Sequence, residues 1–292
     1  MQGVLLVLAA AMLWGTTGTA HSFAPAGMSP LWVGALRLLM AGAFFVVLAY
    51  WLRDRAVSGS SPLNLARVAG CALCMATYNL AFFAGLQYTG VGLGTAVALG
   101  SSPIWAGLLQ AVLQRQWPNA LWWLGTSIGV VGGFVMTLGK GADMASSVPG
   151  LLLCLLAGLS YGAYAVINQP LVLQSGVARA NAWVFCGAAL MSLPIAALWG
   201  GAPQASTQGW AVVSYLGLVA TGVAYLLFSS GQRTISAASS VALSKFEPIT
   251  AFVLSILVLG EHASWLALTG LVLVLLGLWL VVHSEMRSHR HA

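Results

Sequence analysis

Long apolar runs follow one another along almost the whole chain, and short turns rich in Gly, Pro and Ser separate them. A helix needs about 20 apolar residues to cross a hydrocarbon core of roughly 30 Å. The runs therefore predict an all-α integral membrane protein with ten transmembrane helices. We expect these helices at residues 3–21, 29–51, 65–86, 91–113, 120–138, 149–168, 178–199, 209–230, 238–259 and 263–283.

The turn-forming residues gather in short linkers such as 58–62, 139–149 and 200–209. None of these linkers can hold an extramembrane domain, so we expect any chemistry to take place inside the helical bundle. The first run has no Lys or Arg before it and no small-residue cleavage pattern, which favours a first helix over a signal peptide.

Composition and charge agree with a membrane protein. Of the 292 residues, 60% are hydrophobic and 5% are charged, and the mean hydropathy is +0.92. A soluble domain carries roughly a quarter charged residues, so the composition excludes one. The basic residues of the predicted loops on one side are Arg53, Arg55, Arg67, Arg115, Arg179, Arg233, Arg287 and Arg290, against Lys140 on the other. The positive-inside rule then predicts an inner-membrane protein with both termini in the cytoplasm, and we expect no nucleic-acid partner.

The four cysteines all fall inside predicted helices. Cys71 and Cys74 form a C-x-x-C pattern, but they lie one turn apart in an apolar helix without a neighbouring His or carboxylate. We interpret them as small packing residues, with a metal or redox site as the alternative. We expect no cofactor and no bound metal.

The two halves of the chain resemble each other at a nearly constant offset. The matching positions are Gln87 and Gln232, Thr89 and Thr234, Val97-Ala98-Leu99 and Val241-Ala242-Leu243, Pro103 and Pro248, Gly125 and Gly270, and Gly132 and Gly277. Each half has five predicted helices, an odd number, so the second half must be inverted relative to the first. We place the two repeats at 1–145 and 146–292, around a central cavity. Inverted repeats that exchange inward and outward shapes are the basis of alternating access, so this pattern indicates a transporter.

Gly125, Gly129 and Gly133 recur at every fourth position of the fifth predicted helix. Small residues at this spacing allow another helix backbone to approach closely. We expect that contact either within the bundle or in a homodimer, so the sequence leaves a monomer and a homodimer open.

Several short motifs occur in a fixed order along the chain. They are Leu13-Trp14-Gly15-Thr16, Arg37-Leu38-Leu39-Met40-Ala41, Phe246-Glu247-Pro248 and Leu259-Gly260-Glu261. In this order and spacing the chain resembles the ten-helix, EamA-type branch of the drug/metabolite transporter superfamily. One departure is the end of the fourth helix, Gln114-Arg115-Gln116, where that family often repeats a Gly-Glu pair. The resemblance implies export of small metabolites, driven by the substrate or a proton gradient without nucleotide, and it is greatest to the YddG-type aromatic amino-acid exporters.

Charged residues well inside the predicted helices are the first candidates for the transport pathway, and they are Arg37, Lys245 and Glu247. Charges at membrane depth are costly and usually face a cavity or a partner. Lys245 and Glu247 are two residues apart and point about 200° away from each other around a helix, so each needs a separate partner. The ammonium and carboxylate of an amino acid could engage such groups. The alternative is that Arg37 or Lys245 satisfies helix-end carbonyls or extends to the membrane surface.

Pro103 and Pro248 occupy matching positions in the two halves. A proline inside a helix removes a backbone hydrogen bond and bends the preceding turn, so we predict these two as hinges of the transport cycle. The alternative is a pair of static kinks satisfied by neighbouring helices.

Aromatic and polar residues share several predicted helix faces, and such mixed faces suit a cavity for amphipathic solutes. With the charged pair, the predicted pathway residues are Trp14, Thr17, Tyr78, Asn79, Phe83, Trp105, Ser160, Tyr164, Trp183, Ser244, Lys245 and Glu247. Other tryptophans near helix ends are expected in interfacial belts, and these are Trp117, Trp122, Trp123, Trp199, Trp210 and Trp279.

The combined interpretation is a carrier that exports amino acids or similar small amphipathic metabolites, in contact with membrane lipid. A carrier of sugars or nucleotide-linked solutes is the alternative within the transporter class, although such anionic cargo would want more basic groups in the cavity. A lipid-modifying membrane enzyme needs clustered His or carboxylates, whereas the acids here are scattered, so we expect no enzyme. A nonselective pore fits poorly with the scarcity of polar helix faces.

Overall fold

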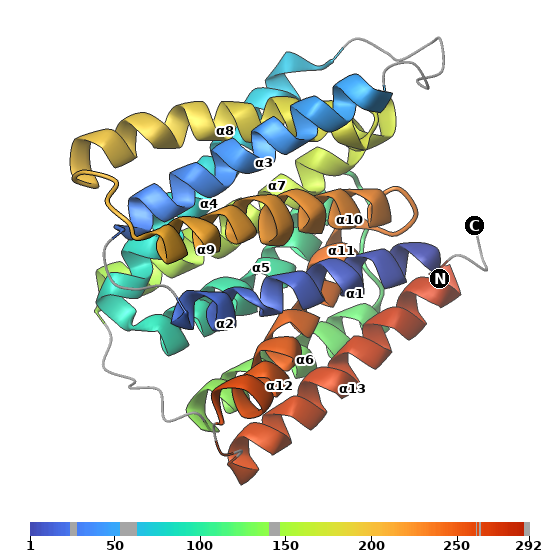
Figure 1. Ribbon diagram of the computed structural model, residues 1–292. Coiled ribbons are helices and arrows are strands. Elements are labelled where there is room, and N and C mark those ends of the chain that lie inside the picture. The colour runs from blue at the N-terminus through green and yellow to red at the C-terminus, as the bar shows by residue number, and fades with distance from the viewer. Residues whose placement is uncertain (24–27, 53–62, 140–146, 261, 263, 289–292) are drawn as a thin grey trace.

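The computed structural model describes residues 1–23, 28–52, 63–139, 147–260, 262 and 264–288, and every regular element in these ranges is helical (Figure 1). In chain order the elements are α1 (Gln2–Gly15), α2 (Thr17–Ser22), α3 (Pro30–Leu52), α4 (Leu65–Thr89), α5 (Val91–Leu113), α6 (Ala120–Gly139), α7 (Val148–Ser175), α8 (Val177–Trp199), α9 (Thr207–Gly217), η2 (Leu218–Val223), α10 (Ala224–Gly231), α11 (Ala237–Leu243), η3 (Ser244–Phe246), α12 (Glu247–Leu259) and α13 (Trp265–Ser288). Some charged residues of the sequence analysis lie outside the described residues, and these are Arg53, Arg55, Lys140, Glu261 and Arg290.

The described residues contain ten segments long and apolar enough to cross a membrane, which confirms the predicted fold class. Three of these spans are interrupted: α1 with α2, α9 with η2 and α10, and α11 with η3 and α12. The predicted end of the sixth helix, at 168, is wrong because α7 continues through Pro170 to Ser175. That proline leaves the Val166 carbonyl without its helical donor, and the Gln114 side chain after α5 donates to this carbonyl at 3.0 Å.

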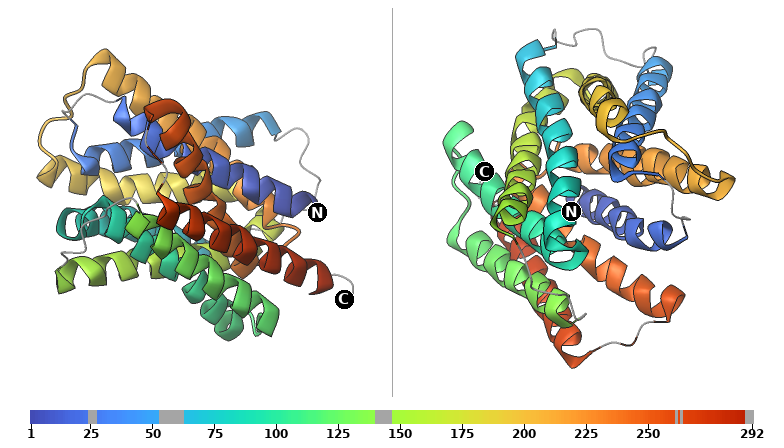
Figure 2. Two further views of the ribbon diagram at one scale, coloured as in Figure 1. Left: turned by 90° about the horizontal axis from the view of Figure 1, so that it is seen from below. Right: turned by 90° about the vertical axis from the view of Figure 1, so that its left-hand side faces the viewer.

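Equivalent helices of the two halves pack against each other. The pairs are α3 with α8, α5 with α11, and α6 with α13, as Figures 1 and 2 show for the outer helices. The bundle is completed by α4 against α7 and by α1 against α10. Exchanging the first half for the second maps each of the three pairs onto itself, which is consistent with an inverted repeat.

Glycines of α6 and α13 form contacts that are related by the internal symmetry. A Cβ built on Gly125 would lie 2.8 Å from the Gly277 carbonyl oxygen, and one on Gly132 would lie 2.8 Å from the Gly270 carbonyl oxygen. Since Gly125 matches Gly270 and Gly132 matches Gly277, exchanging the halves turns one contact into the other. The predicted close approach is therefore confirmed within the bundle.

The glycines of α6 that contact α13 differ from the predicted set at one position. Among the described residues, no atom of another part of the chain lies within 4 Å of a Cβ built on Gly133, whereas Gly129 contacts Gly277. The contact positions are thus 125, 129 and 132, which follow the helical repeat of 3.6 residues more closely than a strict spacing of four does.

Trp122 also departs from its prediction. The sequence predicts an interfacial tryptophan, but its side chain is only 2% exposed and packs against Gly107 of α5. Trp117 precedes α6 and is 73% exposed, as an interfacial residue should be.

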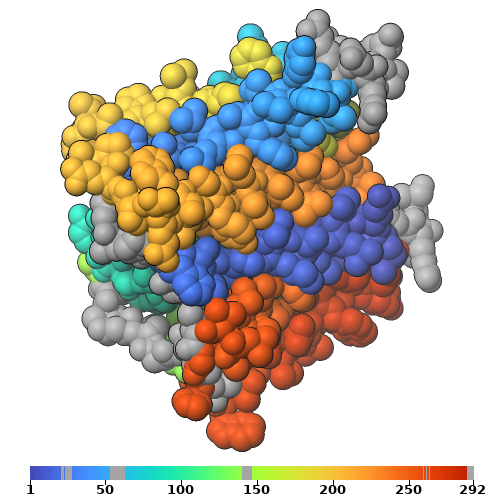
Figure 3. Space-filling model, in the orientation of Figure 1, coloured from blue at the N-terminus to red at the C-terminus, as the bar shows by residue number. Residues whose placement is uncertain are grey.

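Irregular backbone interrupts three spans. The first span breaks at Thr16, η2 is a π-helical segment, and η3 is a short 3-10 turn between α11 and α12. A Cβ on Gly15 would lie 2.6 Å from the Glu247 carbonyl oxygen, so the break in the first span touches the start of α12. Figure 3 shows α3, α10, α1 and α12 in successive bands across this face. These interruptions position the candidate site.

Candidate functional site

Lys245 joins the proline kink of one half to the interrupted helix of the other. Its Nζ atom donates a hydrogen bond to the Leu99 carbonyl oxygen at 2.8 Å. Pro103 follows four residues later and has no N–H to offer this carbonyl. The Ser102 hydroxyl also donates to it, at 2.9 Å. The structure thus realises the alternative that a lysine satisfies a carbonyl, at the kink in the middle of α5 rather than at a helix end.

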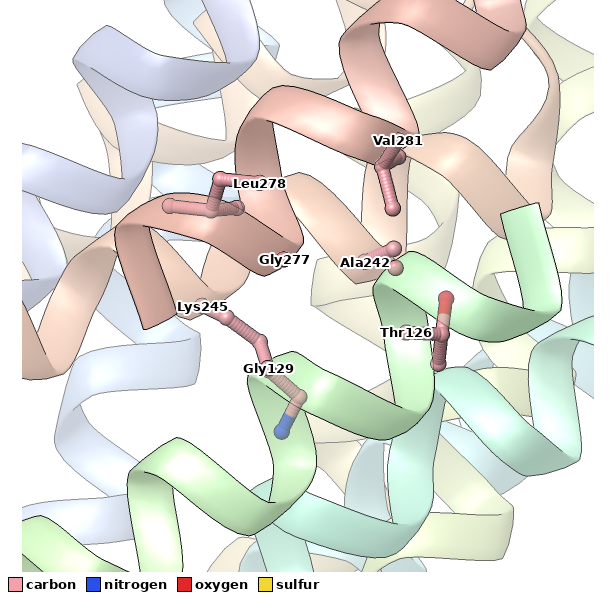
Figure 4. Close-up of a pocket in the computed structure, with 8 residues that line it drawn as sticks. Thr126, Gly129, Ala242, Lys245, Gly277, Leu278 and Val281 are labelled. Carbon is pink, nitrogen blue, oxygen red and sulfur yellow. The ribbon is translucent and has the colours of Figure 1, made fainter. Parts of the chain in front are cut away.

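The aliphatic part of Lys245 lines a small pocket between α6, α11 and α13 (Figure 4). Its Cδ lies 3.9 Å from a Cβ built on Gly129, so the lysine stem packs against α6 at this position. The pocket is also lined by Gly125, Thr126, Ala242, Gly277, Leu278 and Val281. Within the described residues the Thr126 hydroxyl is buried and has no hydrogen-bond partner.

Glu247 lies at the start of α12, against the break in the first span, and is half-buried. Arg37 and Lys245 both interact electrostatically with its carboxylate. No hydrogen bond or ion pair of the carboxylate is found in the part of the chain that the structure describes. The carboxylate therefore lies within the electrostatic influence of two cations that it does not contact directly.

Arg37 is anchored at the π-helical segment. Its Nε donates to the Thr221 hydroxyl at 3.2 Å, and this hydroxyl donates to the Leu216 carbonyl at 2.7 Å. The π geometry displaces one turn of the helix so that the hydroxyl can bridge the two groups. The Nε atom of the guanidinium is thereby fixed.

Aromatic rings form a wall beside these charges. Tyr78 stands near Glu247 and Arg37, and its ring lies 5.4 Å from that of Tyr161. The ring centroid of Tyr161 lies 6.2 Å from that of Trp14. The ring centroid of Trp14 in turn lies 5.1 Å from that of Tyr225. The aromatic wall, made of these four rings, thus draws on α1, α4, α7 and α10, from both halves of the chain.

Pro248, the counterpart of Pro103, lies in the first turn of α12. The turn before it is η3, where the Glu247 N–H donates to the Ser244 carbonyl. The Ser244 hydroxyl is buried and donates to the Val241 carbonyl at 2.7 Å. The carbonyls left free by the two prolines thus have different donors, which are the Lys245 ammonium and the Ser102 hydroxyl at Pro103 and the Glu247 backbone N–H at Pro248.

Other predicted pathway residues adjoin this site. The Asn79 side chain is buried against Gly34 of α3, and Ser160 is buried next to Tyr161. The Thr17 hydroxyl donates to the Trp14 carbonyl at 2.7 Å. Phe83 reaches the wall indirectly, since its ring lies 5.7 Å from Phe82, which stacks on Tyr78.

Three predicted residues lie apart from the charges. Trp183 is 54% exposed on the outer surface of α8. Tyr164 is fully buried with its ring 5.7 Å from Tyr225, one ring beyond the wall. Trp105 lies just after Pro103, and its indole N–H is buried without a partner among the described residues.

Tyr161 and Tyr225 are central to the wall, but the sequence analysis does not select them. The polar face chosen on the sixth helix carries Ser160 and Tyr164, and Tyr161 lies about 100° around the helix from Ser160. A signal for Tyr161 is nevertheless present in the sequence. Tyr161 lies seven residues, or about two helical turns, before the polar residue Asn168 and therefore on nearly the same face of the helix.

The cysteines and the other potential metal ligands do not form a metal centre in the described part of the chain, where no group of three His, Cys, Asp or Glu residues gathers. Cys71 and Cys74 are free thiols on α4.

The sequence comparisons with known proteins point to transporters. A model described as the EamA-like transporter family matches residues 1–138 and 148–283. The uncharacterized transporter YwfM of Bacillus subtilis (strain 168) is 33% identical over 288 residues, which cover 99% of this chain and 96% of that protein. The biotin transporter of Salmonella typhimurium is 23% identical, with 87% and 85% covered. A crystal structure of a protein with 20% identity aligns over 98% of both chains with a TM-score of 0.82, a likeness in fold.

Proposed function

This chain belongs to the EamA-like transporter family, and we propose that it exports amino acids or similar small amphipathic metabolites by alternating access. We propose further that the repeats at 1–145 and 146–292 are its two moving halves and that both termini are cytoplasmic. The finer proposal is a YddG-like preference for aromatic amino acids. The family matches to 1–138 and 148–283 support the division into halves, since each lies within one proposed repeat.

The observation that carries the proposal is the placement of Glu247 between Arg37 and Lys245 beside an aromatic wall. A zwitterion presents an ammonium group that suits Glu247 and a carboxylate that suits either cation. The rings of Tyr78 and Tyr161 offer contact area to an apolar side chain of the solute. The site thus offers a partner for each of three parts of an amino acid, which are its ammonium group, its carboxylate and its apolar side chain.

Lys245 has a second use in such a cycle. Its ammonium is occupied by the Leu99 carbonyl, so a substrate carboxylate would compete with that carbonyl for the lysine. Binding of the substrate would then loosen the contact between α5 and the span that holds Lys245, which joins the two halves. Transport requires such a link, because a ligand shifts a conformational equilibrium only through contacts that differ between the states.

The proposal is tested by counterflow into proteoliposomes. Vesicles loaded with a mixture of amino acids would be diluted into labelled phenylalanine, leucine, serine or glutamate, and uptake would be compared with protein-free vesicles. We expect accumulation of at least one neutral amino acid, greatest for large side chains. Absence of exchange for every amino acid would contradict the proposal.

A second candidate is a small monocarboxylate. The site holds two basic side chains and one acidic side chain, so a basic group remains for an anionic group of the substrate. A relative at 23% identity is named a biotin transporter, and biotin carries one carboxylate without an ammonium group. The same vesicles would be assayed with labelled biotin, and uptake of biotin without uptake of any amino acid would favour this candidate.

A further inference from the structure

Two matching residues of the inverted repeat lie in opposite environments. Gln232, at the end of α10, is fully buried, donates to the Ala165 carbonyl at 3.0 Å and accepts from Asn168 at 3.3 Å. Gln87, its counterpart near the end of α4, is exposed. The matched glutamine is therefore enclosed at the corner between α10 and α11 and exposed at the equivalent corner between α4 and α5, whereas the neighbouring matched threonines are reversed, with Thr89 buried and Thr234 exposed. We call these the α10–α11 corner (residues 231–240) and the α4–α5 corner (residues 86–95).

Side chains from two other helices hold the start of α11. The Glu285 carboxylate of α13 accepts hydrogen bonds from the Ser236 N–H at 2.9 Å, from the Ser236 hydroxyl at 3.2 Å and from the Ser239 hydroxyl. Gln110 of α5 accepts from the Ala238 N–H at 2.8 Å. A helix start leaves its first N–H groups without backbone partners, so these side chains satisfy groups that would otherwise be unpaired.

A third helix holds the turn that precedes α11. The Gln169 side-chain amide of α7 donates to the Gln232 carbonyl at 2.9 Å and to the Ile235 carbonyl at 2.8 Å. The α10–α11 corner is thus enclosed by polar contacts from α5, α7 and α13. Such contacts can be exchanged for hydrogen bonds to water when the corner opens, whereas an apolar contact would expose its surface.

The location of this corner gives it a role. It lies at the same end of the bundle as the start of α1 and the end of α13 (Figure 1), and α11 leads directly to Lys245 and Glu247. Movement of α11 away from its neighbours would open a route from this end to the site.

We infer that Glu285 and Gln110 are positioning residues that keep a gate at the α10–α11 corner closed, and that the α4–α5 corner is the opposite gate, which closes when the first one opens. The inference rests on the proposed alternating access and identifies side chains that favour one of its two conformations. In the second state the two matched glutamines exchange environments, so Gln87 becomes buried and Gln232 becomes exposed.

The test is hydrogen–deuterium exchange of the full-length protein in lipid nanodiscs, followed by mass spectrometry of peptides that cover 231–243 and 86–95. The variants are Glu285→Ala and Gln110→Ala. The matched control is Ser264→Ala, because Ser264 likewise accepts from an early N–H of a helix, that of Ala267, and donates to the Gly139 carbonyl outside both corners. Gln110→Ala removes a neutral group and serves if Glu285→Ala does not yield folded protein.

The gate predicts a reciprocal result. Exchange over 231–243 should rise on the order of tenfold when a clamping hydrogen bond is lost, and exchange over 86–95 should fall in the same variant. The control should change neither peptide. Faster exchange over 231–243 without slower exchange over 86–95 would show simple loosening and overturn the inference, as would no change in either peptide.

The experiment uses no substrate, so it separates this inference from the proposed function. Reciprocal exchange in a protein that transports no amino acid would support the gate and refute the substrate class. Amino-acid transport without reciprocal exchange would do the opposite.

Discussion

The Lys245 ammonium donates a hydrogen bond to the Leu99 carbonyl at 2.8 Å, across the interface between the two halves of the chain. Pro103 frees this carbonyl in the first half, and the second half supplies the donor. The matching position of Lys245 in the first half, counted back from the two prolines, is Gly100, which has no side-chain donor to return. The hydrogen bond from Lys245 to Leu99 therefore has no symmetric counterpart from the first half to the second.

A double-mutant cycle tests that Pro103 and Lys245 are coupled through the Leu99 carbonyl. Lys245→Ala should lower the free energy of unfolding by about 1–2 kcal/mol, because the partly buried Leu99 carbonyl loses one of its two side-chain donors. In a Pro103→Ala background the N–H of the introduced alanine can donate to the same carbonyl, so Lys245→Ala should cost about 1 kcal/mol less. Thermal unfolding of the four proteins in detergent gives the coupling. Additive effects would show that the lysine does not serve this carbonyl.

Substitution of Glu247 should change substrate selection more than protein abundance. We expect Glu247→Gln to reduce amino-acid counterflow at least about tenfold, because a neutral amide loses the charge-assisted hydrogen bond to the substrate ammonium. Glu247→Asp should retain part of the activity. Inhibition by a deaminated analogue of the best substrate, relative to that substrate, should increase in Glu247→Gln. An unchanged ratio would place the ammonium elsewhere.

The aromatic wall predicts a contrast between a ring at the site and a ring outside it. Tyr161→Ala should raise the KM for large amino acids by about tenfold, since a buried ring contributes on the order of 1.5 kcal/mol or more to contact with an apolar group. Trp183→Ala is the matched control, since Trp183 lies on the same kind of span but is 54% exposed. The KM of this variant should remain at the wild-type value. Equal effects of both substitutions would argue against the wall as a binding surface.

The depth of a residue along a span is predictable from the sequence, but the direction in which its side chain points is less so. Trp183 belongs to a predicted span, yet it lies on the outer surface. An apolar helix has little amphipathic signal, because lipid and bundle interior both accept Trp, so its sequence does not reveal the inner face. Charges differ in this respect, because lipid does not accept them, and Lys245 and Glu247 can be selected on that ground.

Partners across the bundle are the other part that the sequence does not supply. The sequence predicts that Lys245 needs a partner outside its own helix, but nothing in the local pattern identifies the carbonyl of Leu99, 146 residues away. The corner held by Glu285, Gln110 and Gln169 escapes prediction for the same reason, since these residues come from three helices. The spans can be predicted because each depends only on a continuous apolar run.

Close packing of α6 on α13 gives a prediction with an internal control. Gly125→Ala would place a Cβ about 2.8 Å from the Gly277 carbonyl oxygen, a backbone atom that cannot move aside like a flexible side chain. We expect it to lower the free energy of unfolding by about 1–3 kcal/mol through overpacking. Gly133→Ala should be neutral or slightly stabilising, because no atom lies within 4 Å of its Cβ and alanine is the better helix former. Thermal unfolding of both variants in detergent decides the matter. If the two glycines responded alike, helix propensity rather than the Gly125–Gly277 contact would account for both, and the symmetric packing of the repeats would lose its strongest support.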